Sequence, residues 1–339
     1  MEKNNFDSVR ICLALIVVLA HIYALTLFDE FRFLERIFDS NFAVKGFFAI
    51  SGYLVTLSYF SSRSNLVFYE KRIRRIYPAY IISVCFCLII GAIISQLSIL
   101  DFLKSYETIK YLISNALFLN FIQPSLPRVF HNHPIVSLNG ALWTIKVEVM
   151  LYLCLPMIIF FYKRIGLLKT TITIFILSVI WVYFFTFCFN GVKGEEIARQ
   201  FPGQLSYFIV GSFLAVNHQK IKISLWITLL SIIALCYTSN PIARLIINPL
   251  TYTIIVIFLS TNALPKINAG KFGDISYGIY LFHFPIIQLT LHLGLFAPNP
   301  WFGFIVSLLT TLLFATCSWH FVEKRFLKRN SHYITSSMS

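Results

Sequence analysis

The first apolar stretch of the chain, residues 6–28, holds two ionisable side chains whose spacing could support chemistry. Arg10 and His21 are eleven positions apart, a separation that returns a helical side chain to within about 20° of its starting direction, about 16 Å further along the axis. If this stretch spans a bilayer, both share one face, with Arg10 at an edge and His21 near the midplane. Ionisable groups at that depth usually face a cavity or a partner, so we interpret His21 as a functional group. The alternative is a packed histidine bonded to a neighbouring helix.

Three other polar residues fall at a similar depth when each is counted along its own apolar stretch. Glu148, Ser51 and His283 lie about 22, 20 and 13 Å from the inner edge of a core about 30 Å thick, compared with about 16 Å for His21. Four polar groups from four predicted helices therefore fall in one central layer.

Each of these groups also has a purely structural interpretation. Glu148 could pair with Lys146, although residues two apart on a helix point to different sides. Ser51 and the glycine after it could form a small-residue packing patch between helices. His283 could be held by a neighbouring carbonyl group, because Pro285 disturbs the local helical hydrogen bonding.

A buried neutral histidine can act as a base, and a nearby carboxylate such as Glu148 can orient it and stabilise its protonated form. That pair suits removal of a proton from a hydroxyl that attacks a thioester or ester, with no metal required. Arg72 and Arg75, three apart on a predicted helix, and Arg10 suit a phosphate-bearing ligand. Binding of anionic lipid headgroups, or a role in topology alone, is the alternative for these arginines.

The composition indicates what must position these side chains. The 339 residues are 58% hydrophobic and only 12% charged, so we predict an all-α, polytopic membrane protein with helices around a central polar cavity. The net charge of +14 resides mostly in short loops, so it reports membrane orientation and not nucleic-acid binding. The seven cysteines lie in apolar stretches without metal-ligand spacing, which predicts neither a metal site nor disulfides.

About 20 apolar residues per crossing predict ten spans. Inner loops carry about twice as many Lys and Arg residues as outer loops, which places both termini in the cytoplasm. The outer loop contains an amphipathic stretch, 106–122, expected to be a helix on or dipping into the membrane. We expect one membrane domain over 1–330 and a disordered cytoplasmic tail over 331–339. The predicted spans are 9–28, 42–60, 77–98, 143–162, 170–188, 203–217, 223–237, 244–260, 275–295 and 301–321.

Several short motifs together resemble the acyltransferase-3 family of integral membrane O-acyltransferases. Their order and spacing over nearly the whole chain make the set specific. They are Arg10 and His21 with ten residues between them, Phe47-Phe48-x-x-Ser51-Gly52, Arg72-x-x-Arg75, Leu142-Trp143-x-x-x-x-Glu148, Ser276-Tyr277-x-x-Tyr280-Leu281-x-His283 and Glu323-Lys324-Arg325.

The resemblance implies an enzyme of the bacterial cytoplasmic membrane that transfers an acetyl group from cytoplasmic acetyl-CoA to a hydroxyl of a surface polysaccharide, of the O-antigen type, or a related glycan. By this resemblance His21 is the base, Glu148 its partner, and Arg10, Arg72 and Arg75 bind the donor. Ser51, Tyr280 and His283 are expected to contact the acceptor. Many relatives carry a fused extracytoplasmic domain, which is not found in this sequence, so we expect direct action on the acceptor or a separate extracytoplasmic partner.

Two other function classes fit some of these features. A transporter or flippase for a lipid-linked or anionic substrate would also need polar groups at the midplane and a basic mouth. However, the sequence shows neither an internal repeat nor pairs of Gly/Pro-interrupted spans. A non-catalytic scaffold would leave the buried His and Glu without a purpose.

Overall fold

The computed structural model describes residues 4–189, 191–263, 265 and 273–327, and within these ranges the chain is built of helices without β-strands. Long runs of Leu, Ile, Val and Phe satisfy their backbone groups internally as helices, which is the only open-chain solution in a bilayer. The predicted all-α fold class is therefore confirmed. The tail predicted to be disordered, 331–339, lies outside the described residues.

The helices group into two compact units, each assembled from several parts of the chain. The first unit takes its described residues from 4–9, 41–72 and 147–265, and the second takes them from 10–40, 73–146 and 273–327. Three long helices contribute to both: α1 (Phe6–Thr26), α4 (Asn65–Ile94) and α7 (Trp143–Ile165).

The remaining elements belong almost entirely to one unit or the other. The first unit holds α3 (Ser40–Phe60), α8 (Leu167–Tyr183), a π-helix (Phe184–Cys188), α9 (Val192–Ala198), α10 (Phe201–Val216), α11 (Leu225–Tyr237) and α12 (Pro241–Thr261). The second unit holds two 3-10 turns (Asp29–Phe31 and Gly140–Leu142), α2 (Arg32–Ile37), α5 (Ile99–Lys104), α6 (Tyr106–Ala116), α13 (Ser276–His292), α14 (Pro300–Cys317), a π-helix (Ser318–Glu323) and α15 (Lys324–Phe326).

Seven described helical segments are long and apolar enough to cross a membrane. They contain α1, α3, α4, α7, α8, α12 and α14. The other three predicted spans correspond to α10, α11 and α13, which have 16, 13 and 17 residues. The expected count of ten crossings is therefore not confirmed by length and composition.

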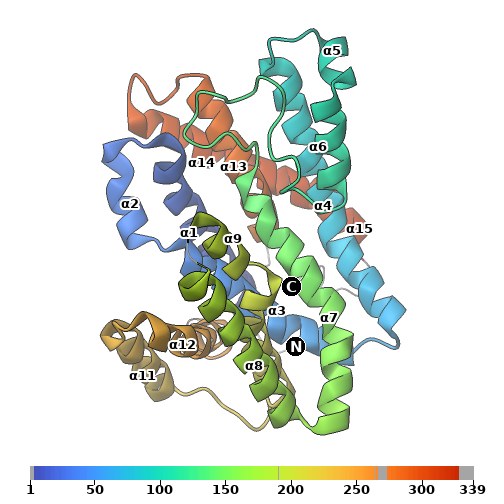
Figure 1. Cartoon of the computed structure of the whole chain (residues 1–339), viewed down its shortest axis with the longest axis vertical. Coiled ribbons are helices and arrows are strands. Elements are labelled where there is room, and N and C mark those ends of the chain that lie inside the picture. Colours follow the sequence, from blue (N-terminus) through green and yellow to red (C-terminus); the bar gives the residue numbers. More distant parts are fainter. Residues whose placement is uncertain (1–3, 190, 264, 266–272, 328–339) are drawn as a thin grey trace. The chain divides into compact units, whose positions relative to one another are not determined.

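Each of the three shorter helices packs along a longer one. Within the first unit α11 and α12 form a hairpin (Figure 1), and the Asn262 side chain donates to the Ile223 carbonyl at 3.1 Å. Within the same unit α10 packs on α8, where the Ser206 backbone N–H donates to the Ser178 hydroxyl at 3.0 Å.

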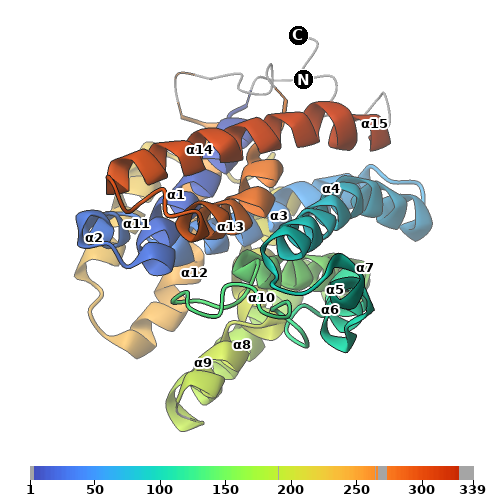
Figure 2. The same ribbon diagram turned by 90° about the horizontal axis from the view of Figure 1, so that it is seen from above.

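In the second unit α13 lies beside α14, as both Figure 1 and Figure 2 show. The hydroxyls of Thr290 and Ser307 are 2.6 Å apart. At the other end of the pair, a Cβ atom at Gly278 would lie 2.7 Å from the Ala315 Cα. Small residues thus allow these two helices to pack closely over the length of α13.

The amphipathic stretch 106–122, which we expect in an outer loop, is helical as predicted but shorter. It forms α6, which the Ser105 side chain caps by accepting a hydrogen bond from the Thr108 backbone N–H. The helix ends at Ala116 and not at residue 122, and Phe118 just beyond it has a left-handed backbone conformation (φ +61°).

Candidate active site

His21 contacts a second histidine, His283, within the second unit. Their side chains come from α1 and α13, and His21 Nδ1 lies 2.8 Å from His283 Nε2. The two rings are nearly parallel, with an interplanar angle of 10°. The edge of the Phe284 ring completes the contact, 5.6 Å from His21 between ring centroids. The two histidines predicted to share a depth in the membrane are therefore neighbours.

The same two helices meet at two further points. Arg10 of α1 forms an ion pair with Asp274 just before α13, and Phe28 stacks on Phe296 after α13. The three contacts follow one another in the same direction along both segments, so α1 and α13 run parallel. Arg10 and His21 accordingly face the same neighbour, as their spacing predicts.

His283 is held on its other ring nitrogen by the backbone of its own helix. Its Nδ1 lies 2.8 Å from the Tyr280 carbonyl oxygen and 3.2 Å from that of Ile279. The structural alternative for His283, support by a carbonyl group, therefore holds together with its contact to His21. His283 is fully buried, whereas His21 is half-buried.

Pro285, two residues beyond His283, removes one backbone hydrogen bond from α13. Proline has no N–H, so the carbonyl of Leu281, four residues earlier, loses its helical partner. The side chains of Asn139 and Ser83 donate to this carbonyl at 2.8 and 3.2 Å. Asn139 begins the 3-10 turn before α7, so its hydrogen bond ties this turn to α13.

Tyr280 lies one turn before His283 on α13. Its hydroxyl is 2.7 Å from that of Thr144 on α7, and its ring lies edge-on to His283 at 5.8 Å between centroids. Tyr280 therefore connects the histidine pair to the first turn of α7. The prediction that Tyr280 and His283 contact the acceptor stays a prediction.

Two of the three predicted donor arginines belong to a buried ion-pair network in the second unit. Arg10 and Arg75 both pair with Asp274, and Arg75 also donates to Glu323 at 2.6 Å. Burial alone would raise the pKa of the Asp274 carboxyl, but Arg10 and Arg75 together lower that pKa to about 2. The two guanidinium groups thus meet two carboxyl groups.

Gly273 allows this network to form beside a large side chain. Its φ of +93° favours glycine, and a Cβ atom there would lie 1.9 Å from the Trp319 indole nitrogen. Trp319 is fully buried and also lies near the Arg75 guanidinium, 5.9 Å from it. The glycine therefore lets the backbone approach the indole immediately before Asp274.

Glu148 belongs to a separate polar cluster in the first unit. Its carboxylate accepts hydrogen bonds from the Ser51 hydroxyl at 3.0 Å and from the Tyr152 hydroxyl. The packing alternative for this motif applies to Gly52, where a Cβ atom would lie 2.1 Å from the Phe208 carbonyl oxygen of α10. Ser51 and Gly52 thus have different roles, one polar and one in close packing.

Arg72 joins the same cluster at its other end. Its guanidinium donates to the Ser58 hydroxyl at 3.1 Å and lies 5.9 Å from the Tyr152 ring centroid. Its Nε is buried and has no hydrogen-bond partner among the described residues. Arg72 and Arg75 lie on one helix, α4, as expected, but they have different surroundings.

The structure therefore brings together His21 with His283, Arg10 with Arg75, and Ser51 with Glu148. His21 and Glu148 belong to different units, so their pairing stays a prediction. Sequence reasoning missed the roles of Asp274, Glu323, Tyr152 and Asn139. For the first two, the available signal was a carboxylate at the end of an apolar stretch in a chain that also has arginines at the ends of other apolar stretches.

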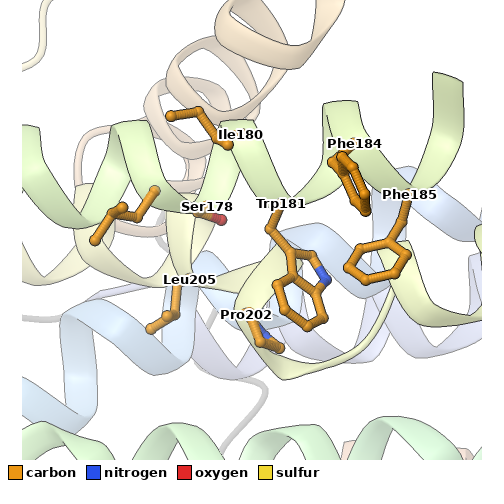
Figure 3. A pocket seen from close by; sticks show the side chains of 8 residues that line it. Ser178, Ile180, Trp181, Phe184, Phe185, Pro202 and Leu205 are labelled. Atoms are coloured by element: carbon orange, nitrogen blue, oxygen red, sulfur yellow. The ribbon is translucent and has the colours of Figure 1, made fainter. Parts of the chain in front are cut away.

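An apolar cavity of about 430 Å³ lies on α8, its π-helix and α10 in the first unit. Figure 3 shows the lining side chains, among them Trp181, Phe184, Phe185 and Pro202. The hydroxyl in the lining, that of Ser178, already accepts a hydrogen bond from Ser206. This cavity can hold an apolar group but offers no acid or base for transfer chemistry.

No cluster of three His, Cys, Asp or Glu residues that could hold a metal ion occurs in the part of the chain that the structure describes. The side chains described above offer imidazole, carboxylate, hydroxyl and guanidinium groups.

Comparison with known proteins gives a consistent result. A family model described as "Acyltransferase domain" matches residues 3–320. An "O-acetyl transferase" of Shigella phage Sf6 is 29% identical, over 98% of each chain, and "Nodulation protein 10" of Rhizobium leguminosarum bv. viciae is 26% identical, over 100% of this chain and 97% of the relative. "O-acetyltransferase OatA" of Staphylococcus aureus is 25% identical over 84% of this chain but only 52% of its own length. No solved structure matches.

Proposed function

The chain belongs to the acyltransferase-3 family and is a membrane acyltransferase, and from this premise we propose that it moves an acetyl group from cytoplasmic acetyl-CoA to a hydroxyl of a surface glycan. The names of the relatives support O-acetyl transfer, and a polysaccharide of the O-antigen type is the acceptor class that we favour. We place the enzyme in the bacterial cytoplasmic membrane with both termini in the cytoplasm.

The observation that carries this proposal is the position of His21. A half-buried imidazole lies within the apolar helix α1, five residues before the helix ends at Thr26, and is hydrogen-bonded through one ring nitrogen. An ionisable side chain in such a place usually serves function. In the proposed reaction it accepts the proton of the acceptor hydroxyl, the oxygen attacks the thioester carbonyl, and the C–S bond breaks as the C–O bond forms. The proton then passes from His21 to the departing thiolate of coenzyme A.

Glu148 is proposed as the acidic partner of this step. It lies one turn after Thr144 on α7, and residues four apart share a helix face. Thr144 contacts Tyr280, whose ring is next to His283. The continuity of α7 therefore supports, by residue spacing alone, a role for Glu148 near the transfer chemistry. Ser51, bonded to Glu148, is proposed to contact the acceptor with Tyr280.

On the donor side we propose that Arg72 makes the principal phosphate contact. Its buried Nε without a partner among the described residues is a donor that a phosphate oxygen could satisfy. Arg10 and Arg75 share their charge with Asp274 and Glu323, so we assign them a weaker pull on the phosphates and a larger part in holding the fold.

Replacing His21 with Ala tests the proposed function. We expect acetyl incorporation into surface glycan to fall by at least about a hundredfold, as for loss of a general base, while the protein stays inserted and abundant. Mass spectrometry of glycans from cells with wild-type protein, the variant or neither measures the acetyl groups. His131→Gln, an exposed histidine of the outer loop, is the matched control. Wild-type acetylation in the His21→Ala cells would contradict the proposal.

A further inference from the structure

The hydrogen bonds around the two histidines determine which nitrogen of each ring carries a proton. A carbonyl oxygen only accepts, so His283 Nδ1, which lies 2.8 Å from the Tyr280 carbonyl, must be the protonated nitrogen of that ring. In a neutral imidazole the other nitrogen is then an acceptor. His283 Nε2 consequently accepts, and His21 Nδ1, 2.8 Å away, must donate.

This chain of donors leaves one nitrogen of His21 with a free lone pair. With the proton on Nδ1, the lone pair of His21 is on Nε2, for which no hydrogen bond is found within the described residues. His21 is also the half-buried member of the pair, whereas His283 is fully buried. His283 is therefore enclosed by protein, whereas His21 has the nitrogen, Nε2, that a substrate hydroxyl can reach.

We propose that His283 is a positioning residue for the transfer reaction, which holds His21 in the tautomer whose Nε2 accepts the hydroxyl proton. The hydrogen bond from His21 Nδ1 to His283 Nε2 then stabilises the His21 imidazolium that forms during the step. His283 fills the position that a carboxylate occupies in a Ser-His-Asp triad, and the Tyr280 carbonyl orients His283 in turn. The inference rests on the proposed function, and it gives His283 a role that differs from acceptor contact.

The surroundings of the pair favour positioning over simple packing. The Asn139 and Ser83 side chains replace the helical hydrogen bond that Pro285 removes next to His283. Tyr280 and Phe284 contact the His283 ring edge-on, with centroids 5.8 and 6.3 Å away. A ring fixed on three sides can set the orientation of the ring that it bonds.

Two variants of His283 separate a hydrogen-bond role from a packing role. Gln offers an acceptor oxygen near the place of Nε2, whereas Leu has a similar size and no acceptor. Inverted membrane vesicles of the producing cells, supplied with radiolabelled acetyl-CoA, provide the assay, because they contain the native acceptor. We expect His283→Leu to lower kcat by about 10²- to 10⁴-fold with little change in KM for acetyl-CoA, and His283→Gln to stay within about tenfold of wild type.

Equal losses in the Gln and Leu variants, or a change confined to KM, would overturn the inference. Vesicles of wild-type protein that transfer no acetyl group would contradict the proposed function instead. A second measurement that does not depend on enzyme activity tests the inference even if the vesicles are inactive or the Leu variant does not fold. Magnetic resonance of wild-type protein with isotope-labelled histidine, compared with His21→Asn for assignment, should show His21 protonated on Nδ1 and bare on Nε2. A proton on Nε2 at neutral pH would refute it.

Discussion

Arg72 and Arg75 are one turn apart on α4, yet their neighbours give them different roles. Arg75 is buried and bonds two carboxylates, Asp274 and Glu323, whereas Arg72 contacts a hydroxyl and an aromatic ring. Loss of one partner from a buried ion pair leaves the other charge uncompensated and costs about 3–5 kcal/mol. Loss of the Arg72 guanidinium, which is partly exposed and has no carboxylate partner among the residues that the structure describes, has no such cost. Replacement of Arg75 should therefore lower the stability of the protein, whereas replacement of Arg72 should weaken binding of the acyl donor.

We expect Arg75→Gln to lower the thermal unfolding temperature of the detergent-solubilised protein by several degrees or to prevent its accumulation. Arg72→Gln should leave that temperature nearly unchanged and raise KM for acetyl-CoA about tenfold or more, the loss expected for a hydrogen bond to a charged group. Lys163→Gln, an exposed cation near the end of α7, is the control. If Arg75→Gln raised KM and left the unfolding temperature intact, Arg75 and not Arg72 would bind the phosphates.

The stability contributed by the Asp274 carboxylate does not depend on pH near neutrality. A lowered pKa means that this stability is present above the ordinary value for an aspartate and is lost only as the pH falls through about 2. Changes in activity between pH 5 and 8 therefore cannot be attributed to Asp274.

At the residue scale the sequence predicts faces better than partners. The shared face of Arg10 and His21 follows from the helical repeat, which is a local property. Counting residues along each span places His21 and His283 at depths in the membrane that differ by only a few ångströms. Their actual hydrogen bond depends on α1 and α13 packing side by side, across more than 250 residues of chain. Asp274 was missed as an arginine partner for the same reason, because ion pairing across helices is not local.

At the scale of elements, close approach between helices depends on single small residues. Gly52 of α3 and Gly211 of α10 each lie where a Cβ atom would come within about 2 Å of a backbone oxygen of the other helix. Pro285 acts differently, since it frees the Leu281 carbonyl and makes α13 depend on a side chain of another segment. The sequence indicates the disturbed helix but not that Asn139 repairs it.

This dependence predicts coupling between Asn139 and Pro285. Asn139→Ala should cost about 1–3 kcal/mol of unfolding free energy, because the buried Leu281 carbonyl loses its shorter hydrogen bond. In a Pro285→Ala background the new N–H can satisfy that carbonyl, so the same substitution should cost less. Thermal unfolding of the two single variants and the double variant measures the difference. Identical costs in both backgrounds would mean that Asn139 stabilises the fold by another route.

At the scale of the whole molecule, the lengths and the packing of the helices bear on the number of membrane crossings. By themselves α10, α11 and α13 would be about 24, 20 and 25 Å long, shorter than a hydrocarbon core of about 30 Å. From the helices that they pack against, we infer that they nevertheless cross. The hydrogen bond between Asn262 and Ile223 brings the start of α11 level with the end of α12, and the short turn at 238–240 joins the other ends. Because α12 is long enough to span, we infer that the segment containing α11 spans too.

The same reasoning applies to the other two short helices. The contact between Ser206 and Ser178 sets an antiparallel register in which Val216 comes level with Leu168, next to the start of α8. In the second unit, Gly273 just before α13 lies beside Trp319 just after α14, and Phe296 just after α13 lies beside Gly303 near the start of α14. The two helices therefore lie side by side over the length of α13. We therefore infer that α10 and α13 cross as well, since extended residues at the helix ends, or local thinning of the bilayer, can make up the difference in length.

Ten crossings and seven crossings predict opposite locations for two points of the chain. With the N-terminus in the cytoplasm, ten place the turn at Lys220 and the end of the chain on the cytoplasmic side, where the basic residues Lys220, Lys222, Lys324 and Arg325 favour them. Seven crossings, with α10, α11 and α13 not crossing, place both points outside.

Fusions of green fluorescent protein and of alkaline phosphatase after residue 220 and at the C-terminus distinguish these cases, with a fusion after residue 239 as the extracytoplasmic control. We expect fluorescence without phosphatase activity at the first two positions and the reverse at 239. Phosphatase activity after residue 220 would show that α10 does not cross, and the register argument for the short helices would then be wrong.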